Sequence, residues 1–379
     1  MNIVVAPDSF KECLSAKEVA ENIAIGIKKV LPGSLIHEIP ISDGGEGVLD
    51  TLLNGVGGKR ISVLVMDPLM RTIEAQYGIL KDKKTAVIEM AKASGLELLK
   101  EYEKNPLHTS TFGTGQMIKD ALNRGCDKFI IGIGGSATND GGAGMVRALG
   151  AKFMDDEGED IPEGGGSLNQ LNTIDLTYFD KRIQSCEVVV ACDVSNPLTG
   201  PNGASMVYGE QKGGSKKDLQ ILDTNLAHYA HCIEIMLGID IDQIPGAGAA
   251  GGTGAGLMAF LKGKLVNGIE LILRTLKIEE HLKEAHLVFT GEGKIDGQTL
   301  QGKTISGIAT LAKKHNVPVI VITGKIGEDI EGIYDMGVNA VFSIVNQPME
   351  LKEAIEHAPQ LIQESAKNIM ATIKCFNKN

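Results

Sequence analysis

Residues 3–18 read IVVAPDSFKECLSAKE, and this stretch carries the pattern that decides the fold. Ile3–Ala6 is a short apolar run, which is typical of a buried strand, and the polar loop Pro7–Leu14 follows it. Ser15 and Glu18 have the spacing of a capping box, which predicts a helix that begins there and continues to about Leu31. A strand, a polar loop and a capped helix form the first part of a βαβ unit. The sequence therefore predicts an α/β protein whose loops follow the strand ends.

The same unit recurs near both ends of the chain. The further strands predicted in this way are His37–Ile41, Leu287–Thr290, Val317–Thr323 and Ala340–Val345. Each precedes a helical stretch, so the five strands together predict one doubly wound parallel sheet of the flavodoxin or Rossmann kind, assembled from both chain ends.

The middle of the chain has a different pattern. Ile61–Val65, Ile73–Leu80 and Thr85–Met90 are joined by short turns and predict a meander. Phe129–Ile133 and Glu187–Ala191 are later strands, each followed by a loop rich in glycine or asparagine. We therefore expect a discontinuous doubly wound domain at 1–60 and 281–379, with a mixed α/β domain inserted at 61–280.

Composition limits the function classes. The net charge is −11 and only 4% of the 379 residues are aromatic, which argues against nucleic-acid binding, because that needs a basic surface or stacking rings. The six cysteines form no C-x-x-C pair, as expected of free thiols in a reducing compartment. No signal peptide or membrane-spanning segment is indicated, so we expect a cytoplasmic protein.

Three familiar nucleotide motifs occur without their usual context. Gly297–Thr304 reads GQTLQGKT, but a P-loop glycine directly follows a strand, and the predicted strand ends at Thr290. Gly246–Gly251 and Gly132–Ala137 fit dinucleotide patterns, but a dinucleotide fold needs a tight turn straight into a helix. A nicotinamide oxidoreductase and a non-catalytic nucleotide-binding regulator therefore stay open as alternatives.

Several loops mix glycine with carboxylates or hydroxyls at strand ends, where α/β sheets bind ligands. Asp8, Ser9 and Lys11 could hold a cation, a phosphate and a substrate together. In Ser42–Gly47, consecutive glycines allow backbone N–H groups to converge on an anion, and the carboxylates imply Mg²⁺ or a substrate hydroxyl.

Three further loops extend this pattern. Gly134–Gly142 combines glycines with neutral polar side chains that can donate to phosphate. Asp193 ends an apolar strand and is either a helix cap or a positioned base, of which we favour the base. Gly246–Gly256 is a phosphate loop or a hinge, and Thr290–Lys303 is crowded with charge. Together the loops suit phosphoryl transfer, and they predict a phosphotransferase or another nucleotide enzyme.

At these loops the chain resembles the bacterial type I glycerate kinase family. The resemblance is carried by PDSFKECLSA (7–16), ISDGGEG (41–47), DPLMR (67–71), IEMAKASGL (88–96), TSTFGTGQ (109–116), IGIGGSATNDGGAG (131–144), ACDVSNPLTGPNGA (191–204), GAGAAGGTGAG (246–256) and TGEGKIDGQTLQGK (290–303). Glu12 and Met70 stand where the resemblance leads us to expect glycine, and Cys13 stands where we expect serine.

The resemblance implies transfer of the γ-phosphoryl group of ATP to D-glycerate with Mg²⁺, giving 2-phosphoglycerate. Phosphorylation at the 3-hydroxyl, or of another small hydroxy acid, is the alternative. It also implies two α/β domains with the active site in the cleft between them. Glycerate and ATP are the expected partners, without nucleic acid or membrane, and a homodimer is an assembly open to the chain.

The expected site residues follow from the loops and the resemblance together. Glycerate brings a carboxylate, for which Lys11 and Arg71 are candidate cations, although Arg71 could equally be an exposed hairpin arginine. The catalytic candidates are Asp193, Asp8 and Lys11. The expected substrate-binding residues are Ser9, Asp43, Gly44, Gly45, Arg71 and Asn196. The expected nucleotide-binding residues are Gly134, Gly135, Ser136, Thr138, Asn139, Gly252, Gly254, Glu292 and Lys303. The candidate metal ligands are Asp296 and Asp140.

Overall fold

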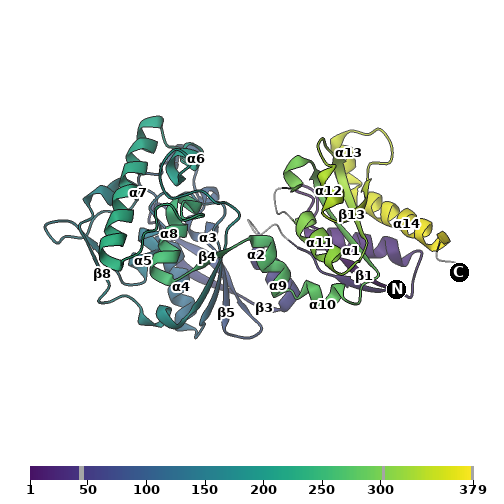
Figure 1. Cartoon of the computed structure of the whole chain (residues 1–379), viewed down its shortest axis with the longest axis horizontal. Helices are drawn as coiled ribbons and strands as arrows, with labels where there is room; N and C mark the ends of the chain where they lie inside the picture. The colour runs from purple at the N-terminus through teal and green to yellow at the C-terminus, as the bar shows by residue number, and fades with distance from the viewer. Residues whose placement is uncertain (42–46, 301–303, 377–379) are drawn as a thin grey trace. The chain divides into compact units, whose positions relative to one another are not determined.

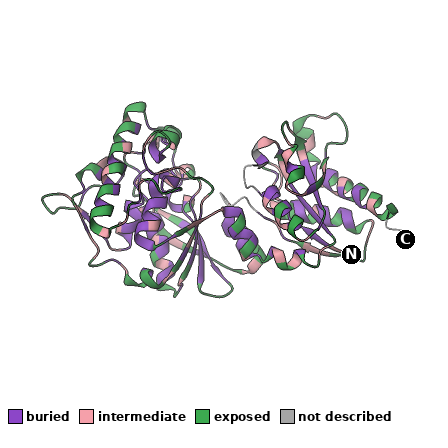
Figure 2. Ribbon diagram, in the orientation of Figure 1, coloured by how far each residue is buried: buried purple, intermediate pink, exposed green. Residues whose placement is uncertain are grey.

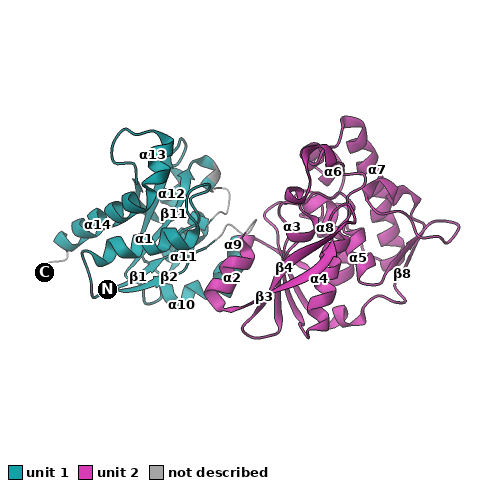
Figure 3. Cartoon of the chain, turned by 180° about the vertical axis from the view of Figure 1, so that it is seen from behind, with its two compact units in different colours: residues 1–43, 269–379 teal, residues 44–268 magenta. Residues whose placement is uncertain are grey.

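The computed structural model describes residues 1–41, 47–300 and 304–376 (Figure 1). The chain divides into two compact units, which Figure 3 colours separately: unit 1 is Met1–Asp43 with Ile269–Asn379, and unit 2 is Gly44–Gly268. The sequence placed these divisions at 60/61 and 280/281. The structure places the first division earlier, at 43/44, because α2 (Val48–Val56) packs on strands β4 (Thr72–Leu80) and β5 (Thr85–Glu89) of unit 2.

Unit 1 has a five-stranded, fully parallel sheet in the order β13-β12-β11-β1-β2. Its strands are β1 (Asn2–Val5), β2 (Leu35–Glu38), β11 (Leu287–Ile295), β12 (Val319–Ile326) and β13 (Val338–Ser343). Read from the β2 edge this is the flavodoxin order 2-1-3-4-5, so the predicted sheet from both chain ends is confirmed. The helix α1 (Ala16–Lys28) begins at Ser15 with the predicted capping box and contacts the C-terminal helix α14 (Ala358–Phe376).

Strand β1 lies at the switch point of this sheet, because its two neighbouring strands, β2 and β11, lie on opposite sides of it. Ligands of open α/β sheets bind outside the carboxyl ends of the strands at such a switch point. The loop with Asp8 therefore starts beside the second half of β11. That strand continues to Ile295, so the predicted end at Thr290 is wrong, and only Asp296 separates it from Gly297.

Unit 2 has a mixed six-stranded sheet in the order β10-β9-β6-β5-β4-β3. Its strands are β3 (Gly58–Met66), β4 (Thr72–Leu80), β5 (Thr85–Glu89), β6 (Lys128–Gly132), β9 (Glu187–Ala191) and β10 (Lys264–Val266). The first three form the predicted antiparallel meander, and β5, β6, β9 and β10 run parallel. The inserted mixed α/β unit is thus confirmed, with a separate small sheet of β7 (Lys152–Met154) and β8 (Thr173–Asp175).

Helices cover both sheets, and Figure 2 shows burial concentrated on the strands and the inward helix faces. The main helices of unit 2 are α4 (Phe112–Asn123), α5 (Ala143–Ala148), α7 (Lys216–Leu237) and α8 (Ala249–Leu261), with the short α3 (Ala91–Ser94) and α6 (Ala204–Tyr208). The helix α9 (Gly268–Thr275) begins at the end of unit 2. The other helices of unit 1 are α10 (Ile278–Leu282), α11 (Thr304–Lys314), α12 (Gly332–Asp335) and α13 (Leu351–Glu356). Within the described part of the chain, no helix has the length and apolar character to cross a membrane.

Two departures from the family pattern fall at special backbone positions. Glu12 has φ +61° and Met70 has φ +60°, in the left-handed region that favours glycine. The glycines expected there from the resemblance thus have a conformational reason, and this chain holds the same turns with residues that bear side chains.

Candidate functional site

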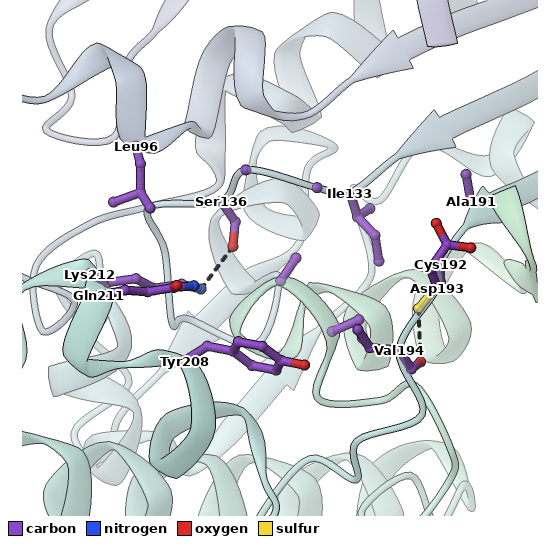
Figure 4. A pocket seen from close by; sticks show the side chains of 14 residues that line it. Leu96, Ile133, Ser136, Ala191, Cys192, Asp193, Val194, Tyr208, Gln211 and Lys212 are labelled. Atoms are coloured by element: carbon purple, nitrogen blue, oxygen red, sulfur yellow. Dashed lines mark hydrogen bonds between the residues drawn. The ribbon is translucent and has the colours of Figure 1, made fainter. Parts of the chain in front are cut away.

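A pocket lies at the carboxyl ends of two neighbouring parallel strands of unit 2. Gly132 of β6 is paired with Ala191 of β9, so the loops after these strands leave the sheet side by side. Both loops line a pocket of about 220 Å³, and a segment around α6 and the start of α8 completes it (Figure 4). Its lining comprises Leu96, Ile133, Gly134, Gly135, Ser136, Ala191, Cys192, Asp193, Val194, Tyr208, Gln211, Lys212, Ala249 and Ala250.

Lys212 is the most unusual residue of this pocket, because it is a lysine with only 2% of its surface exposed. Its Nζ donates to Ser136 Oγ at 2.8 Å and to the carbonyl of Thr138 at 2.7 Å. Burial lowers the pKa of Lys212 to about 7, while the nearby charge of Asp140 acts in the opposite direction. A lysine almost never lies this deep without a partner for its charge.

The loop beside Lys212 offers main-chain donors. Gly135 has φ +70°, which turns the chain sharply after β6. The carbonyl of Gly135 accepts from Leu96 N, and Ala137 N donates to the carbonyl of Ser94. Among the described residues, however, none accepts from the N–H of Gly134, Gly135 or Ser136. Successive N–H groups at such a turn are the usual elements of an anion-binding nest.

Asp140 supports this loop from within the protein core. Its Oδ2 accepts from the N–H and Oγ1 of Thr111, both at 2.8 Å, and from Gly144 N at 3.2 Å. Its Oδ1 accepts from Gly142 N at 3.1 Å. Burial raises the pKa of Asp140, although these hydrogen bonds oppose the rise. The carboxylate is fully buried and holds loops together, so its surroundings favour a structural role over the predicted metal ligation.

Thr138 and Asn139 are also fully buried. Asn139 Nδ2 donates to Ser205 Oγ at 2.7 Å, while Thr138 Oγ1 and Asn139 Oδ1 have no hydrogen-bond partner among the described residues. Neither residue lines the pocket. Their prediction as nucleotide contacts therefore has no support from the pocket's geometry.

The second glycine-rich loop packs against the first. Gly141 N donates to the carbonyl of Gly251 at 3.0 Å, and a Cβ built on Gly251 would lie 1.9 Å from the carbonyl oxygen of Thr138. A Cβ on Gly252 would meet Gly141, and one on Gly254 would meet the carbonyl of Gly246. The glycines predicted to approach phosphate thus allow two segments of backbone to approach each other.

Asp193 lines the pocket on the side opposite Lys212 (Figure 4). Its Oδ1 accepts from Gly268 N at 2.8 Å, at the first residue of α9, and from Asn267 Nδ2 at 3.0 Å. The carboxylate therefore makes the contact of a helix cap and also faces the pocket. The cap contact that the sequence left open is observed, and the base stays a prediction that this position on the pocket permits.

The other predicted residues of unit 2 have protein partners. Asn196 accepts from Tyr208 Oη at 2.8 Å and donates to the carbonyl of Asn202 at 2.8 Å, so it positions a side chain that lines the pocket. Arg71 lies elsewhere, bound through Nε to Asp67 at 2.6 Å and through Nη1 to Glu103 at 2.7 Å. Since Arg71 is outside the pocket lining, the structure does not bring it together with Asp193.

Unit 1 has its own group of predicted residues at the β1/β11 switch point. Asp8 N donates to the carbonyl of Gly291 at 2.8 Å, which ties the loop after β1 to β11. Asp8 Oδ1 accepts from Ser9 N at 2.6 Å, and Asp8 Oδ2 accepts from Thr304 Oγ1 at 2.7 Å. Lys11 is exposed on the same loop.

Two carboxylates follow on β11 and just after it. Glu292 Oε1 accepts from Thr299 Oγ1 at 2.6 Å, and Asp296 pairs with Lys294 at 2.6 Å. Asp43, Gly44, Gly45 and Lys303 lie outside the described residues.

The described residues contain no cluster of three or more His, Cys, Asp or Glu side chains that could hold a metal by themselves. Mg²⁺ does not require such a cluster, because it is usually held by one or two carboxylates together with substrate phosphates and water. Asp8 lies on the loop after β1 and Glu292 on the neighbouring strand β11, and oxygen donors of this kind fit that mode of binding.

Lys212, Gln211 and Tyr208 are pocket residues that sequence reasoning missed. The sequence signal that could have pointed to Lys212 is its position between glycines in GEQKGG (209–214). Gly213 has φ +92°, so the chain turns there, and helix α7 begins three residues later at Lys216. A lysine in such a segment is ordinarily exposed.

Comparisons with known proteins agree with this geometry. The family model described as the glycerate kinase family matches residues 3–374. The chain is 48% identical over 377 residues to a protein named glycerate kinase from Halalkalibacterium halodurans, covering 100% of this chain and 99% of that one. It is also 48% identical over 379 residues to glycerate 2-kinase from Escherichia coli, covering 100% of both.

A solved structure extends the likeness to the fold. The crystal structure of a candidate glycerate kinase 2 from Salmonella typhimurium LT2 matches with a TM-score of 0.91 and 44% identity, over 100% of this chain and 99% of that one. Sequence and fold agree over the whole length, and the chain belongs to the glycerate kinase family.

Proposed function

We propose that this protein transfers the γ-phosphoryl group of ATP to the 2-hydroxyl of D-glycerate, giving 2-phosphoglycerate and ADP. The observation that carries the proposal is the pocket of unit 2, where the carboxylate of Asp193 and the buried Lys212 face one small space beside a glycine loop. The family membership and the E. coli relative's name, glycerate 2-kinase, support the same reaction.

Phosphoryl transfer asks a protein mainly for alignment and for charge neutralisation. In the proposed reaction the acceptor oxygen bonds to the γ-phosphorus, the bond from that phosphorus to the β-phosphate oxygen breaks, and the hydroxyl proton passes to Asp193. Its contacts with Gly268 and Asn267 hold this carboxylate in place. A general base of this kind must lie within hydrogen-bond reach of the hydroxyl.

The switch-point loops of unit 1 are proposed to take the ATP phosphates. Ser9 and Lys11 supply a hydroxyl and a positive charge, and Asp8 with Glu292 would hold Mg²⁺. When bound, Mg²⁺ neutralises charge on the phosphate oxygens. Thr304 and Thr299 orient the two carboxylates through their hydrogen bonds.

The reaction is tested with purified protein, ATP, Mg²⁺ and D-glycerate. ADP release should depend on glycerate, and enolase alone should convert the product, because enolase acts on 2-phosphoglycerate. A product that needs a phosphoglycerate mutase before enolase would show 3-phosphorylation. Without glycerate-dependent ADP the proposal fails, and ATP binding without turnover would support a regulator instead.

The proposal extends to a cytoplasmic location, supported by the six free thiols of Cys13, Cys126, Cys186, Cys192, Cys232 and Cys375. A homodimer stays a prediction, and the molar mass from light scattering after size-exclusion chromatography tests it.

A further inference from the structure

Resting on the proposed function, we infer that Lys212 and the N–H groups of Gly134, Gly135 and Ser136 form an oxyanion site that holds an anionic group of the three-carbon substrate. That group is the glycerate carboxylate or the phosphoryl group that the substrate receives. The two share the same chemistry, an anion with several acceptor oxygens.

The donor count supports this site. A protonated lysine has three N–H donors, and two of those of Lys212 reach Ser136 Oγ and the Thr138 carbonyl. The part of the chain that the structure describes supplies no third acceptor. Together with the three main-chain N–H groups, protonated Lys212 presents four donors to this region. Lys212 and Ser136 are buried, and leaving a buried donor unsatisfied is costly, while Gly134 and Gly135 lie where the pocket opens to solvent and a ligand can reach them.

Charge supports it as well. The cationic form of Lys212 is disfavoured by burial, and Asp140 acts on it only through its charge. An anion beside Nζ would favour the protonated form. The other titratable groups lining the pocket are Cys192 and Tyr208, whose pKa values burial raises, and Asp193. The thiol and the phenol stay neutral near pH 7, so neither competes with Lys212 for a proton.

The size of the pocket limits the ligand. Drug-sized ligands occupy pockets of roughly 300–1,000 Å³. A pocket of about 220 Å³ suits a three-carbon acid or its phosphate rather than a whole nucleotide. Asp193 at the opposite side then has room to face a hydroxyl of the same small molecule.

The test measures binding by titration calorimetry with three probes, D-glycerate, inorganic phosphate and 2-phosphoglycerate. The Lys212→Met variant should bind 2-phosphoglycerate about 10- to 100-fold more weakly than the wild type, as expected for loss of a hydrogen bond to a charged group. Lys216→Met is the matched control, because Lys216 is exposed at the start of α7, and it should bind like the wild type.

The simple probes identify which group the site holds. A Lys212→Met loss for D-glycerate but not for phosphate assigns the carboxylate, and the reverse assigns the phosphoryl group. In wild type at pH 8, calorimetry in two buffers with different ionisation enthalpies should also show up to one proton taken up with the anion, and near pH 6 almost none.

Unchanged affinities of Lys212→Met for all three probes would overturn the site. Should that variant not fold, wild-type NMR decides, because the amide signals of Gly134, Gly135 and Ser136 must shift on saturation with 2-phosphoglycerate, and unmoved signals overturn the site. A Lys212-dependent site in a protein without glycerate-dependent ADP release would refute the proposed function alone. Normal turnover with unchanged binding in Lys212→Met would refute the site alone.

Discussion

Burial of Lys212 should make unit 2 more stable as the pH rises from 7 to 9. The pKa of this lysine falls from 10.5 in the unfolded chain to about 7 in the folded protein. Between those values the unfolded chain binds more protons than the folded one, so raising the pH removes the advantage of unfolding. The free energy of unfolding therefore increases as the pH rises.

The magnitude follows from the two pKa values. One unit of pKa difference corresponds to about 1.4 kcal/mol. At pH 7 the folded group is half protonated, and integration from pH 7 to pH 9 gives a gain of about 2 kcal/mol from this side chain. The Lys212→Met variant lacks the group, so its free energy of unfolding should rise by about 2 kcal/mol less over the same interval.

Urea unfolding followed by tyrosine fluorescence measures this difference. The chain has no tryptophan and six tyrosines, of which only Tyr334 lies in unit 1, so the signal reports mainly on unit 2. Wild type, Lys212→Met and the control Lys216→Met are compared without ligand at pH 7, 8 and 9. The control should keep the wild-type slope. Equal pH slopes in wild type and Lys212→Met would refute the reasoning.

Three further outcomes are expected. Asp193→Asn should lower turnover by about 10²–10⁴-fold, and near-normal turnover would remove Asp193 as the base. Its melting temperature should be nearly unchanged, because the amide oxygen can still accept from the N–H of Gly268. Gly251→Ala should lower the free energy of unfolding in urea by about 3 kcal/mol or more, because its Cβ would meet a carbonyl oxygen at 1.9 Å. The control Gly200→Ala has open space around its Cβ and should lose only about 1 kcal/mol, so equal losses in the two variants would contradict the packing. Arg71→Ala should change KM for glycerate by less than about 3-fold, because its guanidinium is bound to Asp67 and Glu103, and should cost about 1–3 kcal/mol in urea unfolding, because Asp67 is buried and loses a charged partner; a large rise in KM would restore Arg71 as a substrate contact.

The parts of the fold that were predictable from sequence rest on local signals. The capping box of Ser15 and Glu18 satisfies main-chain donors within four residues, so the start of α1 needs no distant contact. The strand at Ile3 is apolar because both faces of a parallel sheet are covered by helices. The second half of β11, with Glu292 and Lys294, was missed because charged residues there do not have the pattern of a buried strand.

The site was only partly predictable for the same reason. The glycines of 134–135 and the carboxylate of Asp193 follow strong strands, and the structure places all three on one pocket. Gly252 and Gly254 have the same local signature, but it serves close backbone packing. Sequence shows that glycine permits close approach, without showing whether a ligand or another loop approaches.

The sequence by itself determined the family, the flavodoxin-like sheet and the loops that mix glycine with carboxylates, because these depend on residues adjacent along the chain. Only the tertiary structure decided which of those residues share a pocket. Lys212 is the clearest case: along the chain it is an ordinary lysine between glycines, and it becomes a buried cation because Ser136 and Thr138, more than seventy residues away, supply its acceptors. Its altered pKa follows from burial, a property of the folded chain that no short stretch of sequence contains.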